Sequence, residues 1–521
     1  MDRFYGEVTV RFDNTLRYNA AIRTEKKNSD FLRSHAYDDT ENKFGRGDLV
    51  TNRFDLLTEF DVVYRNRHGI RVSAAAWYDH AYRGNPRPSS RLANSGNYHN
   101  DHYNSYADRY VAGPSGEILD AFVFSNFYLG DVGVGLKLGK HNVYWGESLF
   151  TIGNGVAYSQ GPVDTIKSAS APGTPAKELF LPIEQVSVEI SLTDELSMAF
   201  QYALDWKPYR LVPGGTFYAP SDGSRSDLAS APAILNGKDF GPHKERGDHG
   251  VNVRWSPWRL NGTVGAYYRK FDEKLPWSFT QVEAGTLPVV RLGFARQTEL
   301  YGLSLTQNIA TMSVAAEITH RKNTALVSRS GYPVMLGAGQ QPSYSQIEGA
   351  RGDSWHALIN TIYLLPRTAL WEGGQLQAEL TYNRLDRVTE DPESRFNARG
   401  AGCTSTYTRH CVTRDAWGAQ ARFTPEWPQL IPGWDVSMPV NLAYGIKGNS
   451  PTLGGTNEGV YSWSIGVEGR YLNKHNFGLS YIDSYSPYRT NPDGTVTSDQ
   501  TIGSPVQNNH GRISFNYRVS F

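Results

Sequence analysis

The sequence is poor in several features that mark common classes of protein. Its 521 residues include only two cysteines and five methionines, and the 52 Lys and Arg residues balance the 52 Asp and Glu residues. A nucleic-acid-binding protein needs a basic face that offsets phosphate charge, so this zero net charge argues against a nucleic-acid partner. Mean hydropathy is −0.49, and no stretch approaches the roughly 20 apolar residues of a membrane-spanning helix. A helical membrane protein is thereby excluded.

Signals for catalysis are also lacking. The sequence contains no G-x-S-x-G, H-E-x-x-H or Walker motif, the patterns that place nucleophiles, zinc ligands or phosphate-binding loops. His141 and His356 fall on predicted strands without a serine-and-acid partner set. The polar loop 80–117 holds histidine and aspartate residues without the fixed spacing of a metal site. We therefore expect no enzymatic activity, no catalytic residue, no cofactor and no metal.

Alternation of polar and apolar residues is the main positive signal. Between residues 8 and 20 one set of alternate positions is mostly apolar and the other is polar or charged, and segments 50–64 and 70–79 repeat the pattern. A period of two indicates a β-strand with two different faces. These segments exceed the ~5–6 residues of an ordinary strand, whereas a membrane-spanning strand needs ~9–11 residues. The pattern predicts membrane-spanning strands.

Eighteen strands are predicted, with sixteen as the alternative. They are residues 6–22, 50–65, 68–79, 118–129, 132–144, 183–192, 195–206, 249–256, 261–271, 297–307, 310–321, 355–364, 374–385, 415–424, 434–445, 460–471, 475–484 and 510–521. Long and short connections alternate strictly between them, as in an antiparallel up-and-down barrel with long extracellular loops and short periplasmic turns. We expect a single domain, residues 1–521, in the outer membrane of a Gram-negative bacterium, with both termini periplasmic.

Both ends of the chain fit this interpretation. The chain opens Met1-Asp2-Arg3-Phe4 without a charged-then-apolar secretion signal, and we interpret Met1 as an expression start that replaces a removed signal. The last predicted strand alternates aromatic and polar residues and closes on Phe521. This ending is typical of the signal that the barrel-insertion machinery binds. Insertion machinery, outer-membrane lipids and lipopolysaccharide are therefore the expected partners.

The polar face of the strands would line the lumen. Opposed charges across a wet pore create a transverse field that orients dipolar solutes, and the alternative is cross-strand salt bridging that stiffens the wall. Because both signs occur, no preference for anions or cations is predicted. The predicted pore-lining residues are Arg11, Arg17, Arg53, Asp55, Glu59, Asp61, Arg71, Glu189, Arg254, Arg269, Glu317, Glu379, Arg422, Arg470 and Arg512.

One long connection is expected to constrict the lumen. Eighteen strands leave a channel wide enough for water unless something fills it, and we expect no plug domain ahead of the first predicted strand. Segment 145–182 is predicted to fold inward, and a lid outside the mouth is the alternative. Its candidate constriction residues are Trp145, Glu147, Asp164, Lys177 and Glu178.

The two cysteines lie in a polar stretch of one predicted outer loop. Cys403 and Cys411 are eight positions apart among Gly, Thr, Ser and Arg residues. An extracellular loop is an oxidising location, so a disulfide between them is expected. Two free thiols are the alternative.

Several motifs resemble a proteobacterial outer-membrane family known as domain of unknown function thirteen-oh-two. They are residues 139–148 (GKHNVYWGES), 162–164 (PVD), 172–182 (PGTPAKELFLP), 206–208 (WKP), 214–217 (GGTF) and 221–222 (SD), and Gly161 departs from the asparagine expected in the family. The resemblance would cover essentially the whole chain, and the family brings no established catalytic or binding residue. Its members are commonly encoded beside a lipoprotein-carrier-like partner and an inner-membrane exporter of the resistance–nodulation–division type. The resemblance thus implies traffic of lipids or other hydrophobic molecules, with a periplasmic lipid carrier and an exporter as partners.

Three functions remain open from the sequence. The first is a channel for hydrophobic or amphipathic molecules, gated by internal loops. The second is a diffusion porin for small polar solutes, indicated by the mixed charges of the inner face. The third is a surface receptor or structural barrel with a plugged lumen, whose long loops bind partners.

Overall fold

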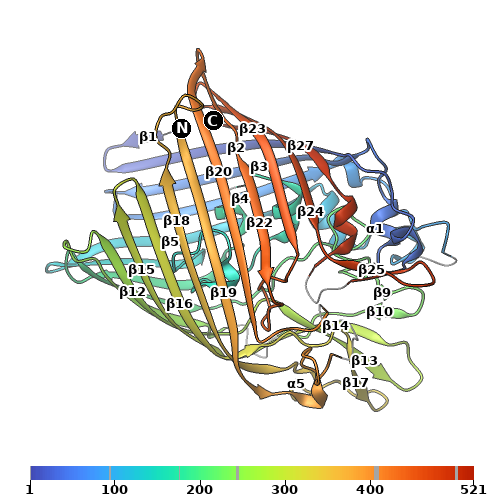
Figure 1. The fold of residues 1–521 in the computed structure, drawn as a ribbon. Helices are drawn as coiled ribbons and strands as arrows, with labels where there is room; N and C mark the ends of the chain where they lie inside the picture. Colours follow the sequence, from blue (N-terminus) through green and yellow to red (C-terminus); the bar gives the residue numbers. More distant parts are fainter. Residues whose placement is uncertain (1, 93–95, 175, 242–245, 404–409, 499–502) are drawn as a thin grey trace.

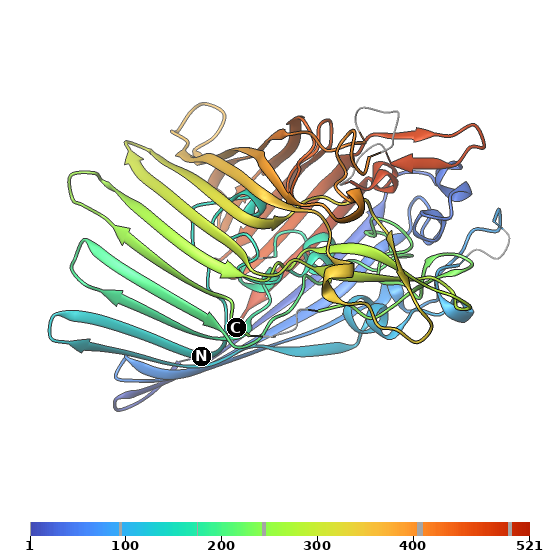
Figure 2. The same ribbon diagram turned by 90° about the horizontal axis from the view of Figure 1, so that it is seen from below.

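The chain folds into a closed β-barrel with an elaborate loop region at one end (Figure 1). The structure, a computed structural model, describes residues 2–92, 96–174, 176–241, 246–403, 410–498 and 503–521, and leaves out the side chains of residues 2–5, 176 and 177. Both termini lie close together at one end of the barrel, and α1, β9, β10, β13, β17 and β25 gather at the opposite end (Figure 1). Figure 2 shows the same division from below.

The largest sheet has 20 strands. Within it β1 (Asp2–Tyr5) only pairs antiparallel with the start of β2, and β21 and β22 follow one another at one position, so eighteen positions close the barrel. The wall strands are β2 (Val8–Arg23), β3 (Leu49–Tyr64), β4 (His68–Asp79), β5 (Ser115–Leu129), β6 (Val132–His141), β7 (Ile183–Ser191), β8 (Leu196–Ala203), β11 (His249–Trp255), β12 (Gly262–Phe271), β15 (Thr298–Ile309), β16 (Met312–Ala325), β18 (Arg351–Leu364), β19 (Gly373–Glu390), β20 (Asp415–Ile431), β21 (Trp434–Ser437), β22 (Val440–Lys447), β23 (Tyr461–Tyr471), β24 (His475–Tyr485) and β27 (Arg512–Ser520). The predicted eighteen-stranded antiparallel barrel is confirmed.

The first and last wall strands close the barrel. β2 pairs with β27 in antiparallel register from Thr15 opposite Ser520 to Arg23 opposite Arg512. The backbone of Phe521 exchanges hydrogen bonds with that of Asn14 at 2.9 and 3.0 Å. The terminal residue therefore belongs to this seam.

The predicted faces of the strands are also confirmed. Large apolar side chains point outward, including Phe12, Phe54, Leu303 and Leu479, which are 47%, 49%, 56% and 55% exposed. The polar residues that alternate with them point into the barrel. An apolar outer belt on a closed antiparallel sheet is the surface that lipid chains require. Among the helices in the described ranges, none is long and apolar enough to cross a membrane.

One wall position departs from the prediction of an unbroken strand over 434–445. Met438 and Pro439 interrupt it between β21 and β22. Proline has no backbone N–H to donate to a neighbouring strand, and here its carbonyl still accepts from the N–H of Gly466 at 3.0 Å. Pairing to β23 resumes at Val440.

The long loops form structure that the sequence analysis did not predict. Five short strands make a second sheet in the order β17-β13-β14-β10-β9, and β25 pairs with β26. Trp277, Phe279 and Tyr332 are buried in the core under this sheet. The remaining elements are β9 (Leu228–Ser230), β10 (Ile234–Asn236), β13 (Pro276–Glu283), β14 (Val289–Phe294), β17 (Tyr332–Leu336), β25 (Tyr488–Thr490), β26 (Val496–Ser498), α1 (Asp38–Asn42), α2 (Ser105–Ala107), α3 (Thr165–Ser170), α4 (Ala176–Leu179) and α5 (Tyr344–Ile347).

Candidate functional site in the barrel lumen

Residues 145–182, which we call the inner segment, connect β6 to β7 through the interior of the barrel. The teal ribbon among the wall strands in Figure 1 belongs to this part of the chain. Its partners come from strands far away in the sequence, because wall side chains of β12, β16, β18 and β19 hydrogen-bond to it. The structure thus places the segment inside the lumen.

Two buried carboxylates of the wall accept hydrogen bonds from its backbone. Glu379, on β19, accepts the N–H groups of Leu149 and Thr151, both at 2.7 Å. Glu317, on β16, accepts the N–H of Val156 at 2.8 Å and also that of Glu147. Hydrogen bonds to a charged acceptor are worth ~1.5–3 kcal/mol each. These carboxylates therefore hold the first part of the inner segment firmly.

Two buried arginines complement the carboxylates. Arg269, on β12, donates to the carbonyls of Val156 and Tyr158, both at 2.7 Å. Arg321, on β16, donates to the carbonyl of Gly153 at 2.8 Å, and its guanidinium carbon lies 3.9 Å from the Tyr158 ring centroid. The wall thus satisfies both N–H and C=O groups of a non-regular segment, which a buried backbone requires.

Amide and imidazole side chains extend the same contact. Asn360 donates to the Glu147 carbonyl at 2.7 Å, and His356 Nδ1 lies 3.1 Å from the Asn154 side-chain oxygen. A close approach also occurs at Gly153, where an added Cβ would lie 2.1 Å from the Gly454 carbonyl oxygen. Glycine is therefore needed where the inner segment meets the loop after β22.

The second part of the inner segment reaches the opposite side of the barrel. Glu178 lies in α4 and pairs with Arg17 of β2, with one N–O distance of 2.6 Å. Asp164 caps α3 by accepting the Lys167 N–H at 3.0 Å and pairs with Arg210 at 2.6 Å. An antiparallel bridge between Val163 and Phe180 closes this part into an arm. The arm, residues 164–179, therefore extends from this bridge to Arg17 on the β2 wall.

The inner segment leaves separate cavities beside it. One of ≈ 710 Å³ lies against β3–β6 and is lined by Phe122, Lys137, Trp145, Phe150 and Phe180 among others; we call it the β3–β6 cavity. A second of ≈ 410 Å³ is lined by Arg17, Pro172, Arg422, Arg470 and Arg518 among others; we call it the β20–β27 cavity. The first is walled largely by aromatic and aliphatic side chains, whereas the second includes several arginines and carboxylates among polar, glycine and apolar residues.

Many predicted pore-lining residues pair within the wall. The closest N–O distances are 2.8 Å for Arg53–Asp55, 2.7 Å for Arg71–Asp61, 2.9 Å for Arg470–Asp435 and 3.6 Å for Arg422–Glu468. Such pairs stiffen a wall. Arg11 lies opposite Asp61 and Asp13 opposite Glu59 in the β2–β3 register, and the Arg512 guanidinium carbon lies 4.9 Å from the Tyr218 ring centroid.

Others contact the inner segment from the wall. Glu317 and Glu379 accept hydrogen bonds from its backbone, and Arg254 reaches Glu147 of that segment at 3.7 Å. Glu189 remains exposed in the lumen. The Lys177 side chain lies outside the described residues. Arg321 was missed, although the alternation that marks Glu317 continues to it.

Trp145 is held within the inner segment and packs against the barrel wall. The backbone N–H of Trp145 donates to the Gln160 side chain at 2.9 Å. Its ring packs against β11, where a Cβ added to Gly250 would lie 2.8 Å from the indole. Gly250 thereby makes room for an aromatic ring that also lines the β3–β6 cavity.

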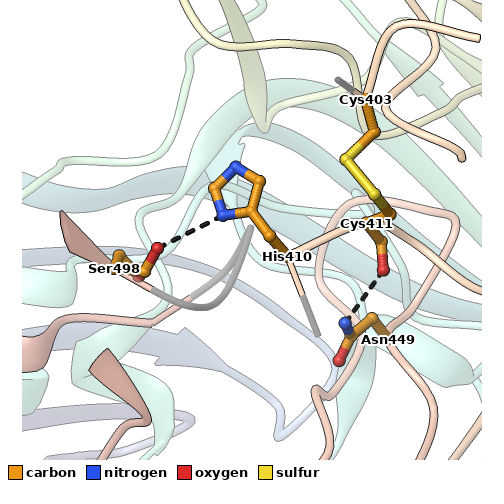
Figure 3. The surroundings of a disulfide bond; sticks show 5 residues. All are labelled: Cys403, His410, Cys411, Asn449 and Ser498. Atoms are coloured by element: carbon orange, nitrogen blue, oxygen red, sulfur yellow. Dashed lines mark hydrogen bonds between the residues drawn. A yellow bond between two sulfur atoms is a disulfide. The ribbon is translucent and has the colours of Figure 1, made fainter. Parts of the chain in front are cut away.

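The predicted disulfide is confirmed. Cys403 and Cys411 are bonded, with their Cα atoms 5.6 Å apart. Figure 3 shows the Cys411 carbonyl accepting from the Asn449 amide at 3.0 Å, while His410 turns toward the Ser498 carbonyl at 3.2 Å. Closing a short loop restricts the unfolded chain, so the bridge is expected to stabilise the folded protein.

A cluster of buried carboxylates lies among the outer loops. One oxygen each of Asp38, Asp39 and Asp222 lies within 4.8 Å of the others. Asp222 accepts the N–H of Asp39 at 2.7 Å, and Asp39 accepts that of Asn97 at 2.8 Å. Burial, and then the neighbouring Asp38 charge, raises the pKa of Asp39 to about 7. Oxygen ligands so arranged could hold a divalent cation, at a place that the sequence analysis did not predict.

Raising the pH from about 5 to about 8 in the presence of EDTA is expected to loosen the loops around this cluster. A carboxyl whose folded pKa lies above its usual value contributes stability at low pH, which is lost as the pH rises through the folded value, here about 7 for Asp39. Limited proteolysis should therefore cut the outer loops of the wild type faster at the higher pH. Asp39→Asn, which carries no charge at this position, is the control that should show a weaker dependence on pH; burial also raises the pKa of the neighbouring Asp222, so some dependence remains. Equal cutting of the wild type at both pH values would contradict the prediction.

The barrel and its contents define a class of protein. A closed antiparallel sheet with an apolar outer belt, a polar inner face and an inward-folded connection is the architecture of outer-membrane-type transmembrane β-barrels. Within that class, the chain belongs to the family described as Protein of unknown function (DUF1302), whose model matches residues 2–521. The resemblance noted in the sequence is thereby confirmed. A comparison with curated proteins gave no significant match.

Three solved structures with a similar chain path are remote in sequence. Acinetobacter baumannii OccAB2 has a TM-score of 0.45 and 10% identity, with 98% of each chain covered. Pseudomonas aeruginosa OccD3 (OpdP) has a TM-score of 0.42 and 10% identity, over 98% of this chain and 91% of that one. Pseudomonas aeruginosa OpdK, solved with vanillate, has a TM-score of 0.44 and 11% identity, over 98% of each chain. At these values the comparisons carry no argument about what this chain transports.

Proposed function

We propose that this protein is an outer-membrane channel for hydrophobic or amphipathic molecules, with the inner segment as its constriction. The observation that carries the proposal is how the segment is held. Buried charged groups of the wall bind its backbone from several strands, yet cavities of ≈ 710 and ≈ 410 Å³ remain on its two sides. A plug that merely sealed the barrel would not need the space that remains beside it.

The proposal includes a location and partners. The protein resides in the outer membrane of a Gram-negative bacterium with its short turns and both termini periplasmic, has no enzymatic activity, and contacts lipid and lipopolysaccharide through its outer belt. The insertion machinery binds the last strand at Phe521. A periplasmic lipid carrier and an inner-membrane exporter exchange cargo with it. The resemblance in sequence supports these last two partners, whereas the exposed apolar belt supports the lipid contact.

A diffusion porin for small polar solutes is the second candidate. The charged lining of the β20–β27 cavity favours it, since Arg17, Arg422 and Arg470 line that side of the lumen. Charged rings and ladders select among hydrated solutes. A receptor or structural barrel with a plugged lumen is the third, and the buried anchors of the inner segment would serve it equally.

Planar-bilayer recording of the purified protein separates the three candidates. The proposed channel is expected to give small or rare openings in salt, together with uptake of an amphipathic fluorescent probe into protein-containing liposomes. Large, steady openings that scale with salt concentration would replace it with the porin. Silence in the bilayer and exclusion of both the probe and small sugars from liposomes would leave the plugged barrel.

A further inference from the structure

The β3–β6 cavity has an apolar side formed by the inner segment. Trp145, Leu149, Phe150, Ile152, Val163, Leu179 and Phe180 line it. Phe180 also packs against Tyr144, with ring centroids 4.1 Å apart, and Phe122 faces them from the wall. At ≈ 710 Å³, the cavity falls within the range of roughly 300–1,000 Å³ that is typical of pockets for small molecules. Such a surface favours a hydrocarbon or aromatic body.

The charged groups on the wall side of this cavity are mostly engaged with one another. Arg71 donates to both oxygens of Asp61 at 2.7 and 2.8 Å. Asp120 accepts the Ser73 hydroxyl at 2.8 Å, and Glu59 and Asp120 also interact electrostatically with Arg71. Arg71 therefore engages the carboxylates on this side of the cavity, Asp61 by hydrogen bonds and Glu59 and Asp120 through its charge.

Lys137 differs from these groups. Its side chain is exposed to the cavity, and its ammonium lies 5.9 Å from the Phe122 ring centroid. Within the part of the chain that the structure describes, it has no ion pair with a carboxylate. An ammonium at the edge of an aromatic cavity complements a ligand that joins an apolar body to a single anion.

We propose that the β3–β6 cavity binds an amphipathic carboxylate, with its carboxylate paired to Lys137 and its apolar body against Phe150 and Phe180. The inference rests on the proposed function, since the bound molecule would be cargo resting beside the constriction. It goes beyond that function by naming the site, the charge of the ligand and the residue that selects it.

Photo-crosslinking tests the site directly. The full-length protein in lipid nanodiscs is irradiated with dodecanoic acid that carries a terminal diazirine, and labelled peptides are identified by mass spectrometry. Label is expected on the peptides that contain Phe150 and Phe180. The methyl ester of the same probe should label them about tenfold less, which corresponds to ~1.4 kcal/mol for the lost ion pair.

Variants of Lys137 identify the selecting group. Lys137→Gln should lower labelling by the acid about tenfold, and Lys137→Arg should restore it. Lys474→Gln is the matched control, because Lys474 lines a different cavity near the turn before β24. Each variant is first checked for the barrel's resistance to unfolding in unheated detergent. Equal labelling by acid and ester, label outside the cavity, or undiminished labelling of Lys137→Gln would overturn the proposal.

Binding and transport can fail separately. A protein that is labelled in this cavity but passes no solute in bilayers or liposomes would overturn the proposed channel and leave the site standing. A conducting protein without label in the cavity would do the reverse.

Discussion

Replacing residues 165–178 with a Gly-Ser-Gly linker should increase single-channel conductance severalfold. Those residues form the arm that extends into the lumen and is bound to Arg17 through Glu178. The bridge between Val163 and Phe180 brings the two ends of the deletion together, so a short linker can close the gap without disturbing the wall. Removing the arm takes away Pro172 and Gly173, which line the β20–β27 cavity, and conductance rises with the cross-section of the water path.

The measurement is planar-bilayer recording beside a matched deletion. Shortening the connection between Glu283 and Val289, in the second sheet outside the barrel wall, removes loop residues without touching the lumen and should leave the conductance at the wild-type value. Unchanged conductance of the arm deletion would contradict the assignment of the arm as the constriction.

The second large effect is expected from the double variant Glu317→Gln, Glu379→Gln. Each carboxylate accepts backbone N–H groups of the inner segment, at 2.7 Å for Leu149 and Thr151 and 2.8 Å for Val156. Neutralising both acceptors costs ~3–6 kcal/mol if each loses one charge-assisted bond. The displaced state of the segment should then become at least about a hundredfold more populated.

Two readouts follow the displaced segment. Chymotrypsin should cut after Phe150, which lies between the two backbone N–H groups that Glu379 holds in the wild type, and bilayer currents should fluctuate between conductance levels. Glu189→Gln provides the control, since Glu189 is an exposed glutamate of the same lumen. A double variant as protease-resistant and as quiet as the wild type would show that these carboxylates do not hold the segment.

The wall strands could be predicted from the sequence because their two faces show in the alternation of neighbouring residues. A strand exposed to lipid on one face and to the lumen on the other must alternate, so Phe12 and Phe54 on one face and Arg17 and Asp55 on the other follow from position alone. The break at Pro439 is also a local effect, but the alternation of apolar and polar residues continues across it and conceals it.

The loop sheet and the anchors could not be predicted in the same way. β9 and β10 have three residues each, too few for a period of two to stand out. The alternation places Glu317 on the inner face of the barrel, whether its carboxylate meets water or the backbone of Val156. Only the path of the inner segment decides between these two surroundings. The disulfide was predictable because a single pairing of two cysteines exists.

The β2–β27 seam dictates the order in which this molecule can be assembled. It joins side chains as far apart as Thr15 and Ser520, separated by 505 positions, so the ring stays open until the last strand has been synthesised. Contacts between distant residues form late, because the intervening chain must first lose its freedom. Arg17, which binds Glu178 of the arm, lies on the seam strand opposite Arg518. The arm can therefore settle against β2 while one side of the ring is still open, and docking of the final strand then encloses it.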